Sequence, residues 1–201
     1  MESLTERYGQ LLLCQLFTQV WYGSWDEFEE TINQLPTEIQ SQFPFYKAYD
    51  REETELWHEN YFKIPGDYFI PPYLSSYQRK TINSENVMKQ DLLNLITAFD
   101  KLGFYYPLEK DQFPDHIGSL TAFITATIAE EIKALHEREE DRVQHLQAIK
   151  EEVYEKYLKP GIDQMWEMNK HKISDPFFKR FIPYFVSNIG FVSNIKTSTG
   201  G

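Results

Sequence analysis

The sequence predicts an all-α fold, a single bundle of about eight to ten helices. Apolar residues recur at spacings of three and four along most of the chain, as they do on the buried face of an amphipathic helix. Capping sequences that begin with serine precede several of these apolar stretches. We find no strong strand alternation, no internal repeat of fixed period and no linker long enough to divide the chain. These observations together predict one all-helical domain.

The first half of the chain contains three predicted helices. Residues 3–6 have capping-box spacing before the apolar stretch 11–20, and residues 24–27 repeat that spacing before a second helix. Residues 50–63 form the third, after an interval that two prolines interrupt.

The predicted helices of the second half are separated by glycine and proline. A helix that opens at Ser84 should end near Gly103, because glycine adopts the left-handed conformation that often follows a helix. Pro160 should break the charged helix that precedes it. The expected helices are 84–103, 115–135, 137–158, 161–171 and 176–192. We expect the domain to span residues 1–195 and residues 196–201 to form a disordered tail.

The charge balance favours a basic partner. The chain carries 31 acidic against 20 basic residues, a net charge of −11. Phosphate backbones and anionic lipid surfaces would repel such a chain, whereas a basic protein or peptide would be attracted; simple solubility is the alternative explanation. The mixed charges of residues 130–156 are typical of a solvated helix face. The sequence shows neither the pattern of a signal peptide nor an apolar run near the ~20 residues that cross a bilayer, so we expect a cytoplasmic protein without stable membrane insertion.

Residues able to carry chemistry are sparse. The single cysteine, Cys14, lies in an apolar run and is expected to be a core residue. His58 belongs to the one Glu-x-x-His pair, although a di-iron bundle needs two, and residues 136–140 depart from the zinc-protease pattern. We therefore expect no metal, no cofactor and no catalysis. A metal-binding or enzymatic helical bundle is the alternative.

Two segments do not fit a simple bundle. Residues 64–77 combine three prolines and a glycine with many aromatic residues, so this loop must either pack on the body or line a binding surface. Residues 113–118 place Asp115 where it could cap the following helix, with His116 in the first turn. One interpretation is a cap beside a packed histidine. The other is a polar, titratable patch beside an aromatic groove.

These two segments carry a family likeness. Residues 114–117, followed by Phe123, resemble the Asp-His-Ile signature of the TorD/DmsD chaperones. Residues 71–77 resemble the Pro-Pro-aromatic-x-Ser-x-Tyr segment of the same family, with tyrosine at position 73 where tryptophan is frequent. The likeness extends over about residues 5–192. The sequence departs from the family pattern at residues 120–122, which supply no carboxylate.

The resemblance implies a molybdoenzyme maturation chaperone of the TorD/DmsD/NarJ kind, which is not an enzyme. Its partner would be the catalytic subunit of a molybdenum-cofactor oxidoreductase, held by its twin-arginine leader peptide, by the apo-enzyme or by both, until the cofactor is inserted and before export or membrane assembly. A nitrate reductase assembly factor of the NarJ kind, whose client need not be exported, is a further alternative. The protein would be a monomer or a dimer that exchanges helices. The expected peptide-binding residues are Pro72, Tyr73, Ser75, Tyr77, Asp115, His116 and Phe123.

Overall fold

The computed structural model describes residues 4–77, 84–104 and 113–192, and in these residues the chain is helical, as predicted. The α-helices are α1 (Leu4–Tyr22), α2 (Trp25–Asn33), α3 (Thr37–Gln40), α4 (Arg51–Phe62), α5 (Ser84–Lys101), α6 (Ile117–Glu137), α7 (Glu140–Val153), α8 (Lys159–Asn169) and α9 (Phe178–Val192). The described residues also contain two 3₁₀ turns, Tyr46–Ala48 and Leu74–Tyr77, and a π-helical turn, Tyr154–Leu158. The predicted domain end at residue 195 and the predicted tail lie outside the described residues, as does the serine of the first capping box.

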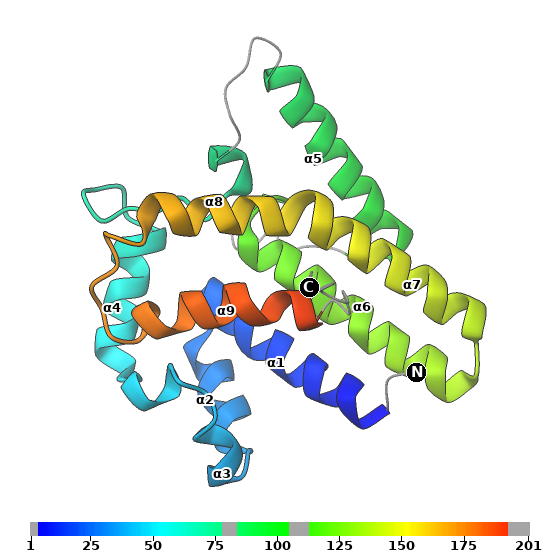
Figure 1. The fold of residues 1–201 in the computed structure, drawn as a ribbon, viewed down its shortest axis with the longest axis horizontal. Coiled ribbons are helices and arrows are strands. Elements are labelled where there is room, and N and C mark those ends of the chain that lie inside the picture. Colours follow the sequence, from blue (N-terminus) through cyan, green and yellow to red (C-terminus); the bar gives the residue numbers. More distant parts are fainter. Residues whose placement is uncertain (1–3, 78–83, 105–112, 193–201) are drawn as a thin grey trace, which may run out of the picture.

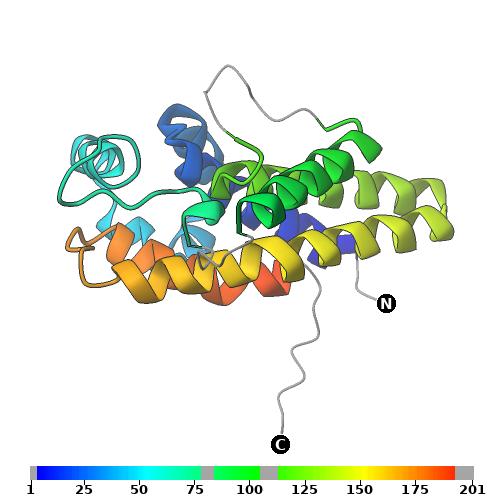
Figure 2. The same cartoon turned by 90° about the horizontal axis from the view of Figure 1, so that it is seen from above.

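The helices form one bundle around α1 and α6. These two helices pack along each other, α9 lies against α1, and α7 lies against α6. Figure 1 shows α7 and α8 as one long helix that runs across the bundle, with α5 projecting from it at an angle. Seen from above, α5 lies beside α7 (Figure 2).

The core between α1, α4 and α9 is built largely from aromatic rings. Phe17 of α1 meets Phe185 of α9 edge to face, with ring centroids 5.1 Å apart. Trp21, one turn later, contacts Phe62 of α4 at 5.2 Å. Edge-to-face contacts of this kind stabilise aromatic pairs beyond the area that they bury. The high aromatic content of the sequence is therefore used in packing.

The prediction that Pro160 ends a helix is wrong. The π turn Tyr154–Leu158 leads directly into α8, and the Lys159 N–H bonds to the carbonyl oxygen of Tyr154, five residues back. Proline has no N–H to donate and would clash with a carbonyl oxygen of the preceding turn in a regular α-helix. The wider turn shifts the hydrogen bonds by one residue at this point, so the helix continues through the proline.

Two charged residues of the segment 130–156 are buried, contrary to the predicted solvated face. Glu131 of α6 forms one ion pair with Arg7 of α1 (Nη1–Oε2 2.9 Å) and another with Lys150 of α7 (Nζ–Oε1 2.6 Å). The side chains of Glu131 and Lys150 are wholly buried and that of Arg7 is 4% exposed. One carboxylate thus links three helices in the core.

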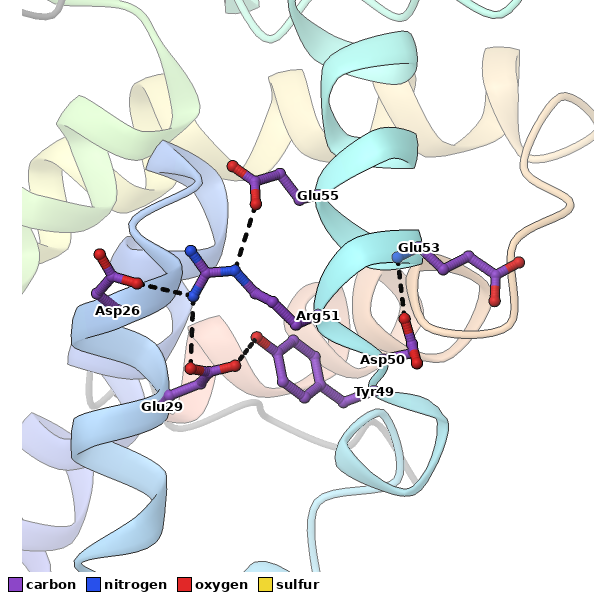
Figure 3. A network of polar contacts seen from close by, with 7 residues as sticks. All are labelled: Asp26, Glu29, Tyr49, Asp50, Arg51, Glu53 and Glu55. Atoms are coloured by element: carbon purple, nitrogen blue, oxygen red, sulfur yellow. Dashed lines mark hydrogen bonds and ion pairs between the residues drawn. The ribbon is translucent and has the colours of Figure 1, made fainter.

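An exposed network links α2 to α4 (Figure 3). Arg51 at the start of α4 pairs with Asp26 (2.9 Å) and Glu29 (3.4 Å) of α2, and with Glu55 one turn along its own helix (3.3 Å). The Tyr49 hydroxyl donates to Glu29 at 2.8 Å. Because exposed ion pairs are screened by water, this network contributes little to the stability of the fold.

In the described part of the chain, no helix combines the length and the apolar character that crossing a bilayer requires.

Candidate functional site

The two segments singled out in the sequence pair with each other. The N–H of Leu74 donates to the carbonyl oxygen of Asp115 (3.0 Å), and the N–H of Ile117 donates to that of Pro72 (2.9 Å). These bonds form an isolated antiparallel bridge between Tyr73 and His116. The proline-rich loop is thereby fastened to the start of α6.

Asp115 was expected to cap α6, but in the structure His116 is the capping residue. The helix cap is His116, whose Nδ1 accepts a hydrogen bond from the N–H of Gly118 at 2.9 Å. Asp115 lies one residue before the cap, and its Oδ2 accepts from the N–H of Ser75 at 3.0 Å. The prediction that Asp115 caps α6 is therefore wrong. Its carboxylate instead holds the 3₁₀ turn Leu74–Tyr77 in place.

The His116 imidazole is buried and neutral. It stacks on Tyr22 at a centroid distance of 5.9 Å and meets Tyr73 edge to face at 5.3 Å. Burial, and then the charge of His58, lower the pKa of His116 to about 3. A proton on Nδ1 would also remove the acceptor that caps α6. The imidazole is therefore not the switchable group that the sequence suggested.

Two further predicted residues serve packing. The Tyr77 hydroxyl donates to the carbonyl oxygen of Pro71 at 2.7 Å and ties the end of the 3₁₀ turn to the proline segment before it. Phe123 is fully buried under α5, with its ring centroid 4.7 Å from that of Phe99 and 5.5 Å from that of Phe104. Pro72 is also buried. Tyr73 is partly exposed, beside the exposed ring of Phe113.

Two small hollows lie beside this fastened turn, and we name them together the Leu74 groove. The two hollows adjoin and share Leu74 and Tyr157. The first hollow lies between the turn, α5 and the start of α6, and it is lined by Leu74, Ser75, Asp91, Leu92, Leu95, Asp115, Leu120 and Tyr157. The second lies between the turn and the α7–α8 helix, and it is lined by Leu74, Tyr77, Lys156, Tyr157, Pro160, Gly161 and Gln164.

Three of the predicted site residues, Ser75, Tyr77 and Asp115, line the Leu74 groove. Asp91 of α5 and Tyr157 of the π turn also line the groove, although they were not among the predicted residues. These residues belong to helices that are remote in sequence from both motifs, and amphipathic periodicity does not tell which helices become neighbours. The departure of Tyr154–Leu158 from regular helix is linked to Pro160, which was the one signal available in the sequence.

The Leu74 groove has a polar edge on an apolar floor. Leu74, Leu95 and Leu120 are buried beneath it, whereas Asp91 is partly exposed. Asp91 and Asp115 belong to the first hollow, and the exposed Lys156 belongs to the second, with its Nζ 5.1 Å from the centroid of the Tyr157 ring. One end of the groove therefore carries carboxylates and the other a cation.

Groups typical of metal or thiol chemistry are not assembled here. In residues 4–77, 84–104 and 113–192 no three side chains of His, Cys, Asp or Glu lie together as metal ligands would. Cys14 is buried, and burial raises the pKa of its thiol to about 12.

The fold and this site define an all-helical bundle. Its proline-rich loop is fastened to the start of α6 and forms one side of a groove with an apolar floor and acidic side chains. The family model of the nitrate reductase delta subunit matches residues 25–166, which include both motifs and the groove. The chain belongs to this family, and through it to the TorD/DmsD/NarJ chaperones of redox enzyme maturation. No curated protein and no solved structure matches the chain.

Proposed function

We propose that this protein is an assembly chaperone that binds the catalytic subunit of a molybdenum-cofactor oxidoreductase in the cytoplasm while the cofactor is inserted. The family supports a role in molybdoenzyme assembly in general terms, since its members are assembly factors and not catalysts. In this proposal the chaperone holds the leader peptide of its client in the Leu74 groove and releases it before export or membrane assembly.

The observation that carries the proposal is the composition of the groove. Asp91 and Asp115 edge a floor made of leucine side chains. A leader segment that combines arginine with apolar residues complements both features. Arginine forms strong charge-assisted hydrogen bonds with carboxylates, and apolar side chains are removed from water when they pack on the leucine floor. The net charge of −11 would also speed the approach of a basic segment.

Nitrate reductase is the second candidate client, and the matching family model favours it. A nitrate reductase catalytic subunit need not carry an export signal. Its chaperone would then hold an N-terminal segment of the apo-enzyme in the same groove.

An affinity pull-down from the native organism, with the partner identified by mass spectrometry, would test the proposal. We expect the catalytic subunit of a molybdoenzyme, and its sequence distinguishes an exported client from a nitrate reductase. Recovery of no molybdoenzyme subunit under conditions in which such enzymes are expressed would contradict the proposal.

Calorimetry with a peptide that spans the client's N-terminal segment then locates the site. The informative variant is Asp115→Asn, because asparagine keeps an acceptor for the Ser75 N–H and removes the charge; Asp115→Ala would also release the turn. We expect Asp115→Asn to weaken binding about tenfold and the exposed Asp67→Asn control to leave it unchanged, with wild-type affinity falling as salt rises. Equal affinity in all three proteins, without salt dependence, would place the peptide elsewhere.

A further inference from the structure

The π turn sets the direction of Tyr157. Tyr154, at the start of the turn, is buried, and its hydroxyl oxygen lies so close to Gly190 of α9 that a Cβ there would be 2.6 Å away. Tyr157 lines both hollows of the Leu74 groove. Because the π turn holds one residue more than an α-helical turn, it separates these two side chains around the axis, one toward α9 and one toward the groove. Single π turns of this kind occur frequently at functional sites.

The Tyr157 hydroxyl is prepared for a ligand. Its oxygen is shielded from water, and the residues that the structure describes supply no hydrogen-bond acceptor for it. The neighbouring Lys156 ammonium lies over the ring and can only donate toward the Tyr157 oxygen, so the hydroxyl proton still lacks an acceptor. Buried donors in native proteins are almost always paired, and one left unpaired beside a groove is available to a bound molecule.

Asp91 offers an accessible charge in the same groove. Its carboxylate is partly exposed on α5, and its charge acts on the exposed Lys156, although the two form no direct ion pair in the described chain. Asp115, by contrast, is a buried residue with 7% of its surface exposed, and its carboxylate already accepts a hydrogen bond from the N–H of Ser75. Of the two acids in the first hollow, Asp115 contributes its charge from a fixed position, and Asp91 is the one that can turn toward a ligand.

We propose that Asp91 and Tyr157 are specificity-determining residues of the Leu74 groove. The Asp91 carboxylate pairs with a basic side chain of the bound segment, and the Tyr157 hydroxyl donates to one of its backbone carbonyl oxygens. This inference rests on the proposed function, in which the groove takes a peptide. It assigns recognition of charge to α5 and recognition of the peptide backbone to the π turn.

Two fluorescently labelled synthetic peptides test this assignment by anisotropy. The first has two adjacent arginines followed by a leucine-rich segment, and the second has glutamine in place of both arginines. Asp91→Asn should weaken binding of the arginine peptide about tenfold and change that of the glutamine peptide little, because the lost interaction requires the peptide charge. Tyr157→Phe should weaken both peptides by a similar factor, roughly threefold to tenfold, because the backbone is common to both.

Two control variants make the test specific. Asp100→Asn removes the same charge from α5, but position 100 is exposed and lies nine residues from Asp91, on the opposite face of the helix. Tyr68→Phe removes the hydroxyl of a half-exposed tyrosine outside the groove. Both controls should bind like the wild type. Thermal melts should show no loss of stability in Tyr157→Phe, since the removed hydroxyl has no acceptor in the described chain, whereas a merely structural tyrosine would lower the melting temperature.

The outcomes separate this inference from the proposed function. If the wild type binds the arginine peptide while Asp91→Asn and Tyr157→Phe bind it equally well, the residue assignment is overturned and peptide binding stands. If Asp91→Asn and Asp100→Asn weaken binding of the arginine peptide equally, Asp91 acts only through the net charge of the protein. Its assignment as a specificity-determining residue would then be overturned. If the wild type binds neither peptide, both the groove as a peptide site and this inference are wrong.

Discussion

Replacing Glu131 by glutamine should destabilise the protein severely. Glu131 pairs with Arg7 at 2.9 Å and with Lys150 at 2.6 Å, and all three side chains are at least 96% buried. Glutamine would remove the negative charge that both buried cations contact. Removal of one partner from a buried ion pair costs about 3–5 kcal/mol. For a chain of 201 residues, at roughly 2–4 °C per kcal/mol, this corresponds to a fall in melting temperature of about 6–20 °C.

The adjacent residue supplies the control. Glu130 has the same charge and also pairs with a cation, Arg142, but its side chain is 38% exposed. Glu130→Gln should therefore cost at most about 1 kcal/mol. Thermal and urea melts monitored by circular dichroism at pH 7 measure both variants. Equal losses of stability in Glu130→Gln and Glu131→Gln would refute the reasoning, because burial would then make no difference.

The pH dependence gives a second check on the same variant. Burial already lowers the pKa of Lys150, and the loss of Glu131 lowers it further. The unfolded chain would then bind this proton more tightly than the folded chain, so stability rises with pH across that interval. The difference in melting temperature between Glu131→Gln and the wild type should narrow as the pH rises toward 10. A constant difference from pH 6 to 10 would contradict this account.

Three further predictions concern single residues. Gly161→Ala should lower the free energy of unfolding by about 1–2 kcal/mol in urea melts, because the added Cβ would lie 2.6 Å from Leu74. The control Gly9→Ala, on the open face of α1, should be neutral or stabilising by up to about 1 kcal/mol. Equal effects would refute the close approach of α8 to the turn. The wild type should lose stability as the pH falls from 6.5 toward 4, because the pKa of His116 is about 3 when folded and near 6.5 when unfolded, so the unfolded state binds the proton first. His116→Asn keeps a capping acceptor that does not titrate, so its melting temperature should depend less on pH in this range; an unchanged dependence would contradict the low pKa. Cys14 should resist a thiol-specific disulfide reagent at pH 8 in the native protein and react on unfolding, since burial raises its pKa to about 12; rapid native labelling would show that the site opens.

The helices follow from local patterns. Apolar spacing predicted α4 over residues 50–63, and the structure places it at Arg51–Phe62, with Asp50 as the cap that accepts from the N–H of Glu53 at 3.0 Å. The expected end of α5 at Gly103 is confirmed by the φ of +61° at that residue. These signals act within a few residues of each other, so the sequence alone contains them.

The site depended on contacts that no local pattern encodes. Both motifs were recognisable, but which atom of Asp115 or His116 bonds to which N–H was decided by the pairing of two segments about 40 residues apart. Burial then made His116 a neutral cap instead of a titratable group.

The sequence by itself determined the fold class, the positions of most helices and the membership of a chaperone family, because periodicity and short motifs are local. The tertiary structure alone decided that Glu131 and Lys150 lie in the core and that Asp91 and Tyr157 share a groove with the loop. A charged helical residue has the same local pattern whether it faces water or an opposite charge on another helix. Its environment is fixed only when the helices pack, since the cost of burying a charge depends on the partner that packing supplies.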